Sequence, residues 1–221
     1  MTTGLEAIVF DLDGVLIEGE EVWDQVRQEL ARERGGRWGD DAQAAMMGMS
    51  SPEWSRYMAD ELGVPMTPAA INDEVVERVI ARYARELPLV DGAVEVVGAL
   101  ARRWPLGLAS SANRPVIDFV LDRSGMAGSF RATVSSEEVA HGKPAPDVYL
   151  EAAARLGADP ERCAAVEDSA NGLRAATAAG MRVVAIPNRR FPPAQELVDA
   201  ADLAVTGLRE LEPEAFERLA A

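Results

Sequence analysis

The residues best suited to chemistry are two aspartates near the start of the chain. Asp11 and Asp13 come directly after the apolar run at 7–10, and Gly14 follows them at once. The run is β-prone and predicts a buried strand, so we expect both carboxylates at the edge of a sheet. One carboxylate can attack phosphorus and form a covalent intermediate. A second carboxylate, two residues later, can protonate a leaving oxygen and then deprotonate water.

Three later stretches carry the side chains that such chemistry needs. Ser110 follows the apolar run at 105–109, and Glu167 and Asp168 follow the run at 163–166. Lys143 lies in a loop that precedes a predicted helix. Because ligands bind at the carboxyl ends of parallel strands, we expect all these loops to meet at one edge of the sheet.

The residue types at this edge suit metal-assisted phosphoryl transfer. Asp11, Glu167 and Asp168 would crowd three negative charges together, which is costly unless a cation neutralises them. Mg²⁺ takes oxygen ligands and relieves that cost. Ser110 can donate to a phosphoryl oxygen, and Lys143 can neutralise its charge. Lys143 is the only lysine among 22 lysine and arginine residues, which indicates a compact ammonium rather than a planar guanidinium.

Each pattern also has an ordinary structural interpretation. Asp-x-Asp-Gly can be a simple turn, and a glycosyltransferase can bind its metal through an Asp-x-Asp pair. The glycosyltransferase interpretation leaves Lys143 unexplained. The acidic pair before Ser169 can favour the start of a helix, although Ser169 is the better cap. Ser111 can replace Ser110 as the phosphate-binding residue, and Asn113 either contacts substrate or begins a helix.

Composition narrows the class of protein. The chain has 221 residues, of which 48% are hydrophobic, and a formal net charge of -15. We therefore expect a buried core and no affinity for nucleic acid or anionic membranes. The sequence has no long apolar run and no basic-then-apolar start of the signal-peptide kind. Cys163 is the single cysteine, so no internal disulfide is expected, and we predict a cytoplasmic protein.

The order of predicted elements indicates an α/β fold with an insert. Residues 19–87 have helical patterns only, while helices and strands alternate from residue 88 onward. We predict a Rossmann-like parallel sheet with helices on both faces, formed by 1–18 and 88–221, and an all-helical cap domain at 19–87. The strands are predicted at 7–10, 105–109, 131–134, 163–166, 182–186 and 203–205. The helices are predicted at 20–34, 40–47, 51–62, 67–87, 91–103, 113–123, 146–156, 169–179, 192–200 and 208–221.

Local signals set several helix ends. Asp40 is a predicted N-cap, and Ser51 caps the next helix, with a proline in the first turn. Thr67 precedes a proline in the same way. Trp23, Trp38, Trp54 and the five methionines of the insert are expected mostly to fill its core, with one or two of them lining a pocket.

The motifs together resemble those of the haloacid dehalogenase superfamily. The resemblance rests on Asp11-Leu12-Asp13-Gly14-Val15, Ser110, Gly142-Lys143-Pro144-x-Pro146-Asp147 and Glu167-Asp168-Ser169-x-x-Gly172, in that order. The insert resembles the cap of the phosphoglycolate phosphatase and β-phosphoglucomutase branch.

The resemblance implies a role for each motif residue. Asp11 would be the nucleophile, and Asp13 the acid and base whose carbonyl also binds Mg²⁺. Asp168 would bind the metal, and Glu167 would be a ligand or support one. The residues that hold the phosphoryl group would be Ser110 and Lys143, with Ser111 and Asn113 as further substrate contacts.

We therefore expect a Mg²⁺-dependent hydrolase of small phosphomonoesters, sugar phosphates among them, that acts through an aspartyl-phosphate. One alternative is a phosphomutase, but Trp23 and Ser51 stand where that mutase resemblance calls for His and Arg. Asp13 argues against a dehalogenase, and the complete motif set argues against a non-catalytic phosphate- or metal-binding protein. Monomer and homodimer both stay open. Arg37 and Arg56 are expected at the surface, although either can contact substrate.

Overall fold

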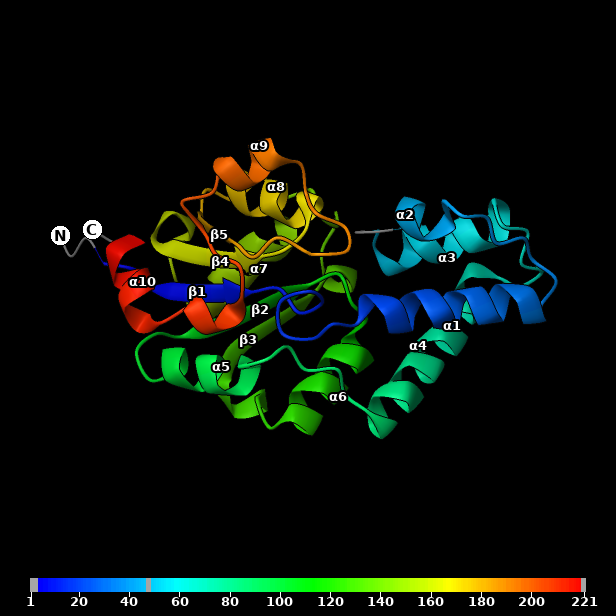
Figure 1. Cartoon of the computed structure of the whole chain (residues 1–221), viewed down its shortest axis with the longest axis horizontal. Coiled ribbons are helices and arrows are strands. Elements are labelled where there is room, and N and C mark those ends of the chain that lie inside the picture. Colours follow the sequence, from blue (N-terminus) through cyan, green and yellow to red (C-terminus); the bar gives the residue numbers. More distant parts are fainter. Residues whose placement is uncertain (1–3, 47–48, 220–221) are drawn as a thin grey trace.

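A six-stranded parallel sheet forms the centre of the computed structural model, which describes residues 4–46 and 49–219 (Figure 1). The strand order is β3-β2-β1-β4-β5-β6, and every neighbouring pair runs parallel. The predicted α/β class with a parallel sheet is confirmed. The strands are β1 (Ala7–Phe10), β2 (Leu106–Ser110), β3 (Phe130–Ser135), β4 (Cys163–Glu167), β5 (Arg182–Ala185) and β6 (Leu203–Ala204).

Helices cover both faces of this sheet. Ile8 and Phe10 of β1 pack into one hydrophobic cluster with α5, α6 and α10, while Ala7 and Val9 pack into another with α7 and α8. This alternation follows from the two-residue period of a strand. Both faces of β1 are buried, which is why its sequence is a continuous apolar run. The helices are α1 (Glu20–Glu33), α2 (Ala42–Met46), α3 (Ser51–Asp60), α4 (Pro68–Arg85), α5 (Ala93–Ala101), α6 (Arg114–Ser124), α7 (Asp147–Leu156), α8 (Ala170–Ala178), α9 (Gln195–Asp199) and α10 (Pro213–Leu219).

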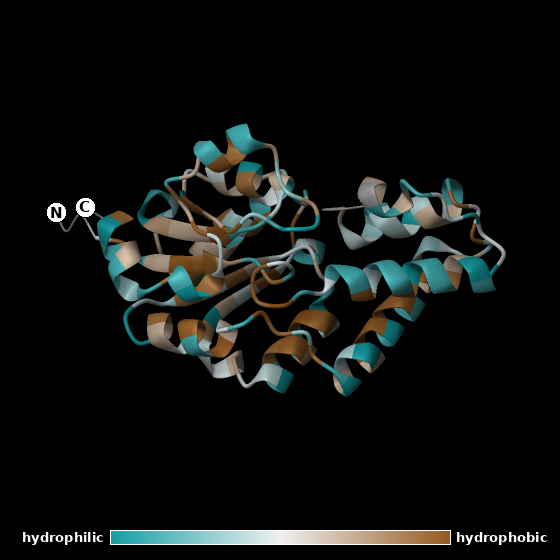
Figure 2. Ribbon diagram, in the orientation of Figure 1, coloured by the Kyte–Doolittle hydropathy of each residue, from teal (hydrophilic) through white to brown (hydrophobic). Residues whose placement is uncertain are grey.

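Helices α1 to α4 form a separate group beyond the carboxyl end of the sheet, which we call the helical segment (Figure 1). The chain enters and leaves it through two paired stretches. The Glu18 N–H donates to the Pro88 carbonyl at 2.8 Å, and the Val90 N–H donates to the Leu16 carbonyl at 3.0 Å. Figure 2 shows apolar residues concentrated in the sheet and in the inner sides of the helices, with polar residues along the outside of α1.

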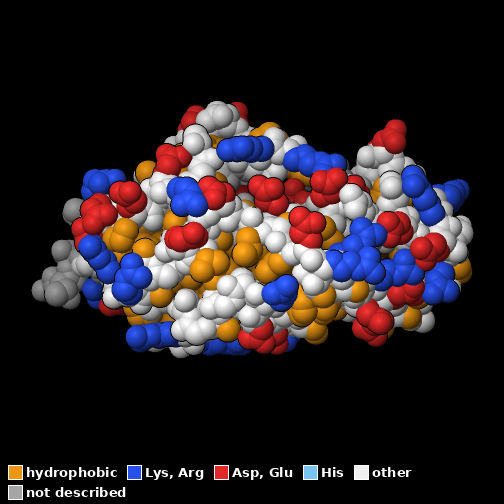
Figure 3. Space-filling model, turned by 60° about the horizontal axis from the view of Figure 1, so that its bottom comes forward, with side chains coloured by type: hydrophobic (Ala, Val, Ile, Leu, Met, Phe, Trp, Pro, Cys, Tyr) orange, Lys and Arg blue, Asp and Glu red, His pale blue; other side chains and the backbone are white. Residues whose placement is uncertain are grey.

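Ion pairs supplement the apolar packing of α1 against α4. Arg82 contacts Glu29 at 2.7 Å, and Arg78 contacts Glu33 at 2.7 Å. Figure 3 shows basic side chains interspersed with acidic ones on this face of the molecule. Such partly exposed pairs contribute little individually, so burial of the apolar stripe provides most of the stability.

Several helix ends differ from the sequence-based expectations. Helix α2 begins at Ala42 rather than Asp40, and the predicted end at Met47 lies outside the described residues. Ser50, not Ser51, caps α3, because its backbone is extended and the Glu53 carboxylate accepts from both its N–H and its hydroxyl.

The chain after residue 190 has shorter helices than expected. The predicted helix at 192–200 begins only at Gln195, since the prolines at 192 and 193 disfavour helical backbone before them. The predicted helix from 208 is a 3₁₀ turn at Leu208–Glu210 followed by α10, which starts on Pro213. The predicted caps at Thr67 and Ser169 are confirmed by their bonds to backbone N–H groups.

None of the helices within 4–46 and 49–219 combines the length and the apolar character needed to cross a bilayer.

A buried contact between α8 and the end of β4 yields a stability prediction. A methyl group at Gly172 would lie 1.7 Å from Oε1 of Glu167, whereas one at Gly98 in α5 would meet nothing within 4 Å. We expect Gly172→Ala to destabilise the fold by about 2–3 kcal/mol through overpacking. Gly98→Ala, the matched control, should instead stabilise it by about 0.5–1 kcal/mol. Urea denaturation measures both, and equal effects would contradict the packing argument.

Candidate active site

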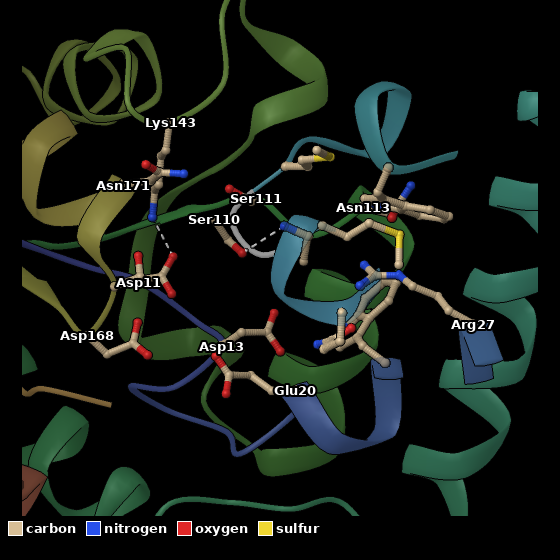
Figure 4. Close-up of a pocket in the computed structure, with 17 residues that line it drawn as sticks. Asp11, Asp13, Glu20, Arg27, Ser110, Ser111, Asn113, Lys143, Asp168 and Asn171 are labelled. Atoms are coloured by element: carbon tan, nitrogen blue, oxygen red, sulfur yellow. Dashed lines mark hydrogen bonds and ion pairs between the residues drawn. The ribbon is translucent and has the colours of Figure 1, made fainter. Parts of the chain in front are cut away.

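The loops at the carboxyl edge of the sheet bring the singled-out side chains together (Figure 4). Asp11 and Asp13 follow β1, and Asp168 follows β4, the neighbour of β1 in the sheet. Ser110 is the last residue of β2, and Lys143 comes from the loop between β3 and α7. The helices that follow β1 and β4 in the core, α5 and α8, cover opposite faces of the sheet. A crevice therefore opens between the carboxyl ends of these two strands.

Lys143 lies at the centre of the buried charges. Its Nζ contacts Asp11 Oδ1 at 2.6 Å, Glu167 Oε1 at 2.5 Å and the Ala109 carbonyl at 3.0 Å. An ammonium has three N–H donors, and all three have acceptors here. Burial disfavours the charged form, but Asp11 and Glu167 outweigh it, so the pKa of Lys143 is raised. The lysine is therefore held protonated.

Both oxygens of Glu167 are already engaged. Oε1 accepts from Lys143 and from the Tyr149 hydroxyl at 2.9 Å. Oε2 accepts from the N–H groups of Asp168 and Ser169 and from the Ser169 hydroxyl. The side chain is fully buried, so this carboxylate anchors the lysine and the start of the loop after β4.

Three carboxylates form a group that can hold a cation. Oxygens of Asp11, Glu167 and Asp168 lie within 4.8 Å of one another. Burial raises the pKa of Asp11 and of Asp168, and for Asp168 the two neighbouring carboxylates raise it further. Asn188 donates to Asp168 Oδ2 at 2.9 Å and orients it. The donors are all oxygen atoms, which suits a hard divalent cation.

The glycine after Asp13 is required by this arrangement. Gly14 has a φ of 86°, a conformation that side chains disfavour. A methyl group there would also lie 1.9 Å from Asp168 Oδ2. The loop after β1 can therefore approach Asp168 only with glycine at this position.

Asp13 has an unusual environment for a carboxylate. Its Oδ1 is buried and has no hydrogen-bond partner among the described residues. Burial, followed by the charge of Glu20, raises the pKa of Asp13 to about 7, while Arg27 and Trp23 act in the opposite direction. A carboxyl that exchanges its proton near neutral pH is suited to general acid and base catalysis.

The loop after β2 places the remaining polar candidates. The Ser110 hydroxyl accepts from the Ala112 N–H at 3.0 Å, and Ser111 lines the cavity. Asn113 is the N-cap residue of α6, and its amide donates to Asn72 of α4 at 2.9 Å. Asn113 thus links the sheet edge to the helical segment, while its Oδ1 is buried and has no partner in the part of the chain that the structure describes.

A cavity lies between the sheet edge and the helical segment. From the core it is lined by Asp11, Asp13, Ser110, Ser111, Ala112, Asn113, Lys143, Asp168, Ser169 and Asn171. From the chain of the helical segment it is lined by Glu20, Trp23, Arg27, Gln43, Met46, Met49 and Trp54. One or two of the tryptophans and methionines of the insert were expected to line a pocket, and four of them do: Trp23, Met46, Met49 and Trp54.

Some of the cavity-lining residues were not predicted from the sequence. Arg27 and Gln43 line the cavity, whereas Arg37 and Arg56 are exposed, as expected, and do not line it. A usable signal existed for Arg27, because it lies one helical turn after Trp23 and so shares its helix face. No comparable signal marks Gln43.

Residues 5–180 match the family model of haloacid dehalogenase-like hydrolases. The chain belongs to this family. It is also 34% identical over 215 residues to hexitol phosphatase B of Escherichia coli K12, and the aligned region covers 93% of each chain. Family membership agrees with the resemblance drawn from the four motifs.

Solved structures show the same fold. A CbbY variant from Rhodobacter sphaeroides, crystallised with xylulose 1,5-bisphosphate, superposes with a TM-score of 0.83 at 28% identity, covering 96% of this chain and 99% of that one. β-Phosphoglucomutase from Clostridium difficile also gives a TM-score of 0.83, covering 98% of this chain and 97% of that one. At 20% identity the mutase likeness shows the fold alone.

The buried position of Lys143 leads to a second prediction. We expect Lys143→Met to lower the free energy of unfolding at pH 7 by about 3–5 kcal/mol, because Asp11 and Glu167 would stay buried without their cation. Adding Asp11→Asn should recover part of this loss by removing one of the two charges. Chemical denaturation measures all three proteins. A loss below about 1 kcal/mol for Lys143→Met would contradict the conclusion that Lys143 compensates the buried charges of Asp11 and Glu167.

The pKa of Asp13 leads to a third prediction. In metal-free protein, Glu20→Gln should lower the pKa of Asp13 below its value of about 7, because one repelling charge is removed. Carbon-13 NMR titration of the aspartate carboxyls measures the change, with Glu21→Gln, at an exposed site, as control.

Stability gives an independent readout of the same shift. A raised native pKa contributes stability below the ordinary value of 3.8, and that contribution is lost as pH rises through about 7. Above pH 7, Glu20→Gln should therefore raise the free energy of unfolding above that of the parent protein. Glu21→Gln should raise it less. Identical titration of Asp13 in both variants would be incompatible with this account.

Proposed function

We propose that this protein is a Mg²⁺-dependent phosphatase of small phosphomonoesters, with sugar phosphates as candidate substrates. The observation that carries the proposal is the buried Asp11 at the cavity wall, with Lys143 bound to one of its oxygens and Asp13 beside it. Membership of a hydrolase family and similarity to a hexitol phosphatase support the reaction type.

Asp11 is the proposed nucleophile. Lys143 binds its Oδ1, which leaves Oδ2 to attack phosphorus. A bond forms between Oδ2 and phosphorus while the bond from phosphorus to the leaving oxygen breaks. The leaving alkoxide takes the proton of Asp13. Asp13 then deprotonates a water molecule that attacks the aspartyl-phosphate and releases inorganic phosphate and free Asp11.

The proposed metal ligands are the side chains of Asp11 and Asp168 and the carbonyl of Asp13. Bound Mg²⁺ would neutralise the negative charge of the phosphoryl oxygens. Although Glu167 belongs to the acidic group, its oxygens already accept from Lys143, Tyr149 and backbone N–H groups. We assign Glu167 to anchoring Lys143 rather than to direct metal binding.

Ser110 and Ser111 would donate to the phosphoryl oxygens, and Lys143, whose three N–H donors are engaged by the protein, would stabilise their negative charge electrostatically. The Ser110 and Ser111 side chains both line the cavity near Asp11. Ser110 is held by its bond from the Ala112 N–H, so its hydroxyl proton is free to be donated to a ligand.

The helical segment would act as the cap domain, with residues 19–87 closing over the sheet edge. It contributes one wall of the cavity, and it is joined to the core by two chain segments that pair with each other. A cap of this kind excludes water from the reacting groups and selects the substrate.

A phosphomutase is the alternative within the same fold. Trp23 lies in the cavity wall at the position where the mutase resemblance calls for histidine, so a proton-transferring imidazole is missing there. Formation of glucose 6-phosphate from β-glucose 1-phosphate would favour the mutase.

Phosphate release from a panel of phosphomonoesters tests the proposal. With Mg²⁺ we expect turnover that EDTA abolishes and that Asp11→Asn lowers on the order of 10⁴-fold, because the nucleophile is lost. Asp60→Asn, an exposed site in the helical segment, is the control and should leave turnover unchanged. Release by the parent protein that does not exceed release by Asp11→Asn would refute the phosphatase assignment.

A further inference from the structure

Arg27 is a buried cation in the cavity wall opposite the reacting carboxylates. It belongs to α1 and is 8% exposed. Its guanidinium carbon lies 5.0 Å from the ring centre of Trp23 and 4.7 Å from that of Trp54. Figure 4 shows the side chain reaching from α1 into the cavity. The two rings, 6.2 Å apart and inclined at 64°, limit how the guanidinium can turn.

The guanidinium has no anionic partner within the described chain. Among residues 4–46 and 49–219 no carboxylate forms an ion pair with it, and its Nε is buried with no acceptor. Asp13 and Asp24 act on it only at longer range, and the Tyr83 hydroxyl lies nearby. Stacking on tryptophan offsets part of the cost of burying a charge, but the Nε–H stays unsatisfied among the described residues.

Lys143, the other cation that lines the cavity, has no free N–H donor for a second anionic group. Lys143 gives its three donors to Asp11, Glu167 and the Ala109 carbonyl. Arg27 is thus the cavity-lining cation whose donors are uncommitted among the described residues. Its planar fork matches the paired oxygens of a carboxylate or a phosphate.

We propose that Arg27 binds a second anionic group of the substrate, a carboxylate or a second phosphate, at the end away from the transferred phosphoryl group. This rests on the proposed phosphatase function and specifies its substrate class as phosphomonoesters with a further negative charge. Gln43 belongs to the same wall, and its Oε1, which has no partner within 4–46 and 49–219, can accept from a substrate hydroxyl between the two anionic groups.

Matched substrate pairs test this assignment. Sorbitol 6-phosphate and 6-phosphogluconate differ only in a terminal hydroxymethyl or carboxylate, as do D-glycerol 3-phosphate and D-3-phosphoglycerate. We expect kcat/KM to be about 10- to 100-fold higher for the acidic member of at least one pair, the range that a hydrogen-bonded charge gives. Equal values, or a preference for the neutral members, would overturn the proposal.

Substitutions test whether Arg27 causes the preference for the acidic substrate. Arg27→Met should lower kcat/KM for the acidic member to the level of the neutral one, and Arg27→Lys should retain part of the preference. Arg56→Met removes the same charge from an exposed position of α3 and should leave the ratio unchanged. A uniform loss on both members of a pair would mean that Arg27 only packs between Trp23 and Trp54.

Binding separates this proposal from the phosphatase assignment. Calorimetry with the Asp11→Asn variant measures the affinity for both members of each pair without turnover. Tighter binding of the acidic member that Arg27→Met removes would support the subsite even where no phosphate is released. Absence of release combined with equal affinities would refute both assignments, and thermal unfolding of each variant confirms that it is folded.

Discussion

The ammonium of Lys143 between Asp11 and Glu167 is the interaction on which the site depends. Without a cation there, two buried carboxylates would face each other with little water to solvate them. Glu167 is fixed in turn by Tyr149 and by the backbone after β4. The lysine therefore ties the loop before α7 to the ends of β1 and β4. It also leaves Oδ2 as the oxygen of Asp11 that would face the substrate in the proposed mechanism.

The sheet topology makes this ion pair possible. Strands β1 and β4 are neighbours although more than half the chain separates them, and Asp11 and Asp168 lie at their carboxyl ends. Two glycines allow the close approach that follows. Gly14 makes room for the Asp168 carboxylate, and Gly172 makes room for that of Glu167. The negative charge gathered there favours a divalent cation, and Asp13 is left with a pKa near neutrality.

The helical segment contributes a positive charge to the cavity wall. The sheet edge gathers carboxylates, while α1 brings the guanidinium of Arg27 against two tryptophans on the facing wall. Asn113 and Asn72 connect the two sides directly. In this arrangement the core residues would act on the phosphoryl group, and the helical segment would recognise the rest of the substrate.

The sequence by itself determined the elements and the candidate residues, because apolar periodicity, glycines and caps are local signals. The run at 7–10 predicted a buried strand, and Thr67 and Ser169 predicted two helix starts. The first residues of the helices predicted at 40 and 192 were harder to predict, since several residues within one turn can serve as the N-cap or the first helical position. Only the tertiary structure decided which side chains meet. Tyr149 resembles any core residue of an amphipathic helix, yet its hydroxyl binds Glu167. The position of Arg27 in the cavity depends on how α1 is rotated and packed, which residue spacing alone does not specify.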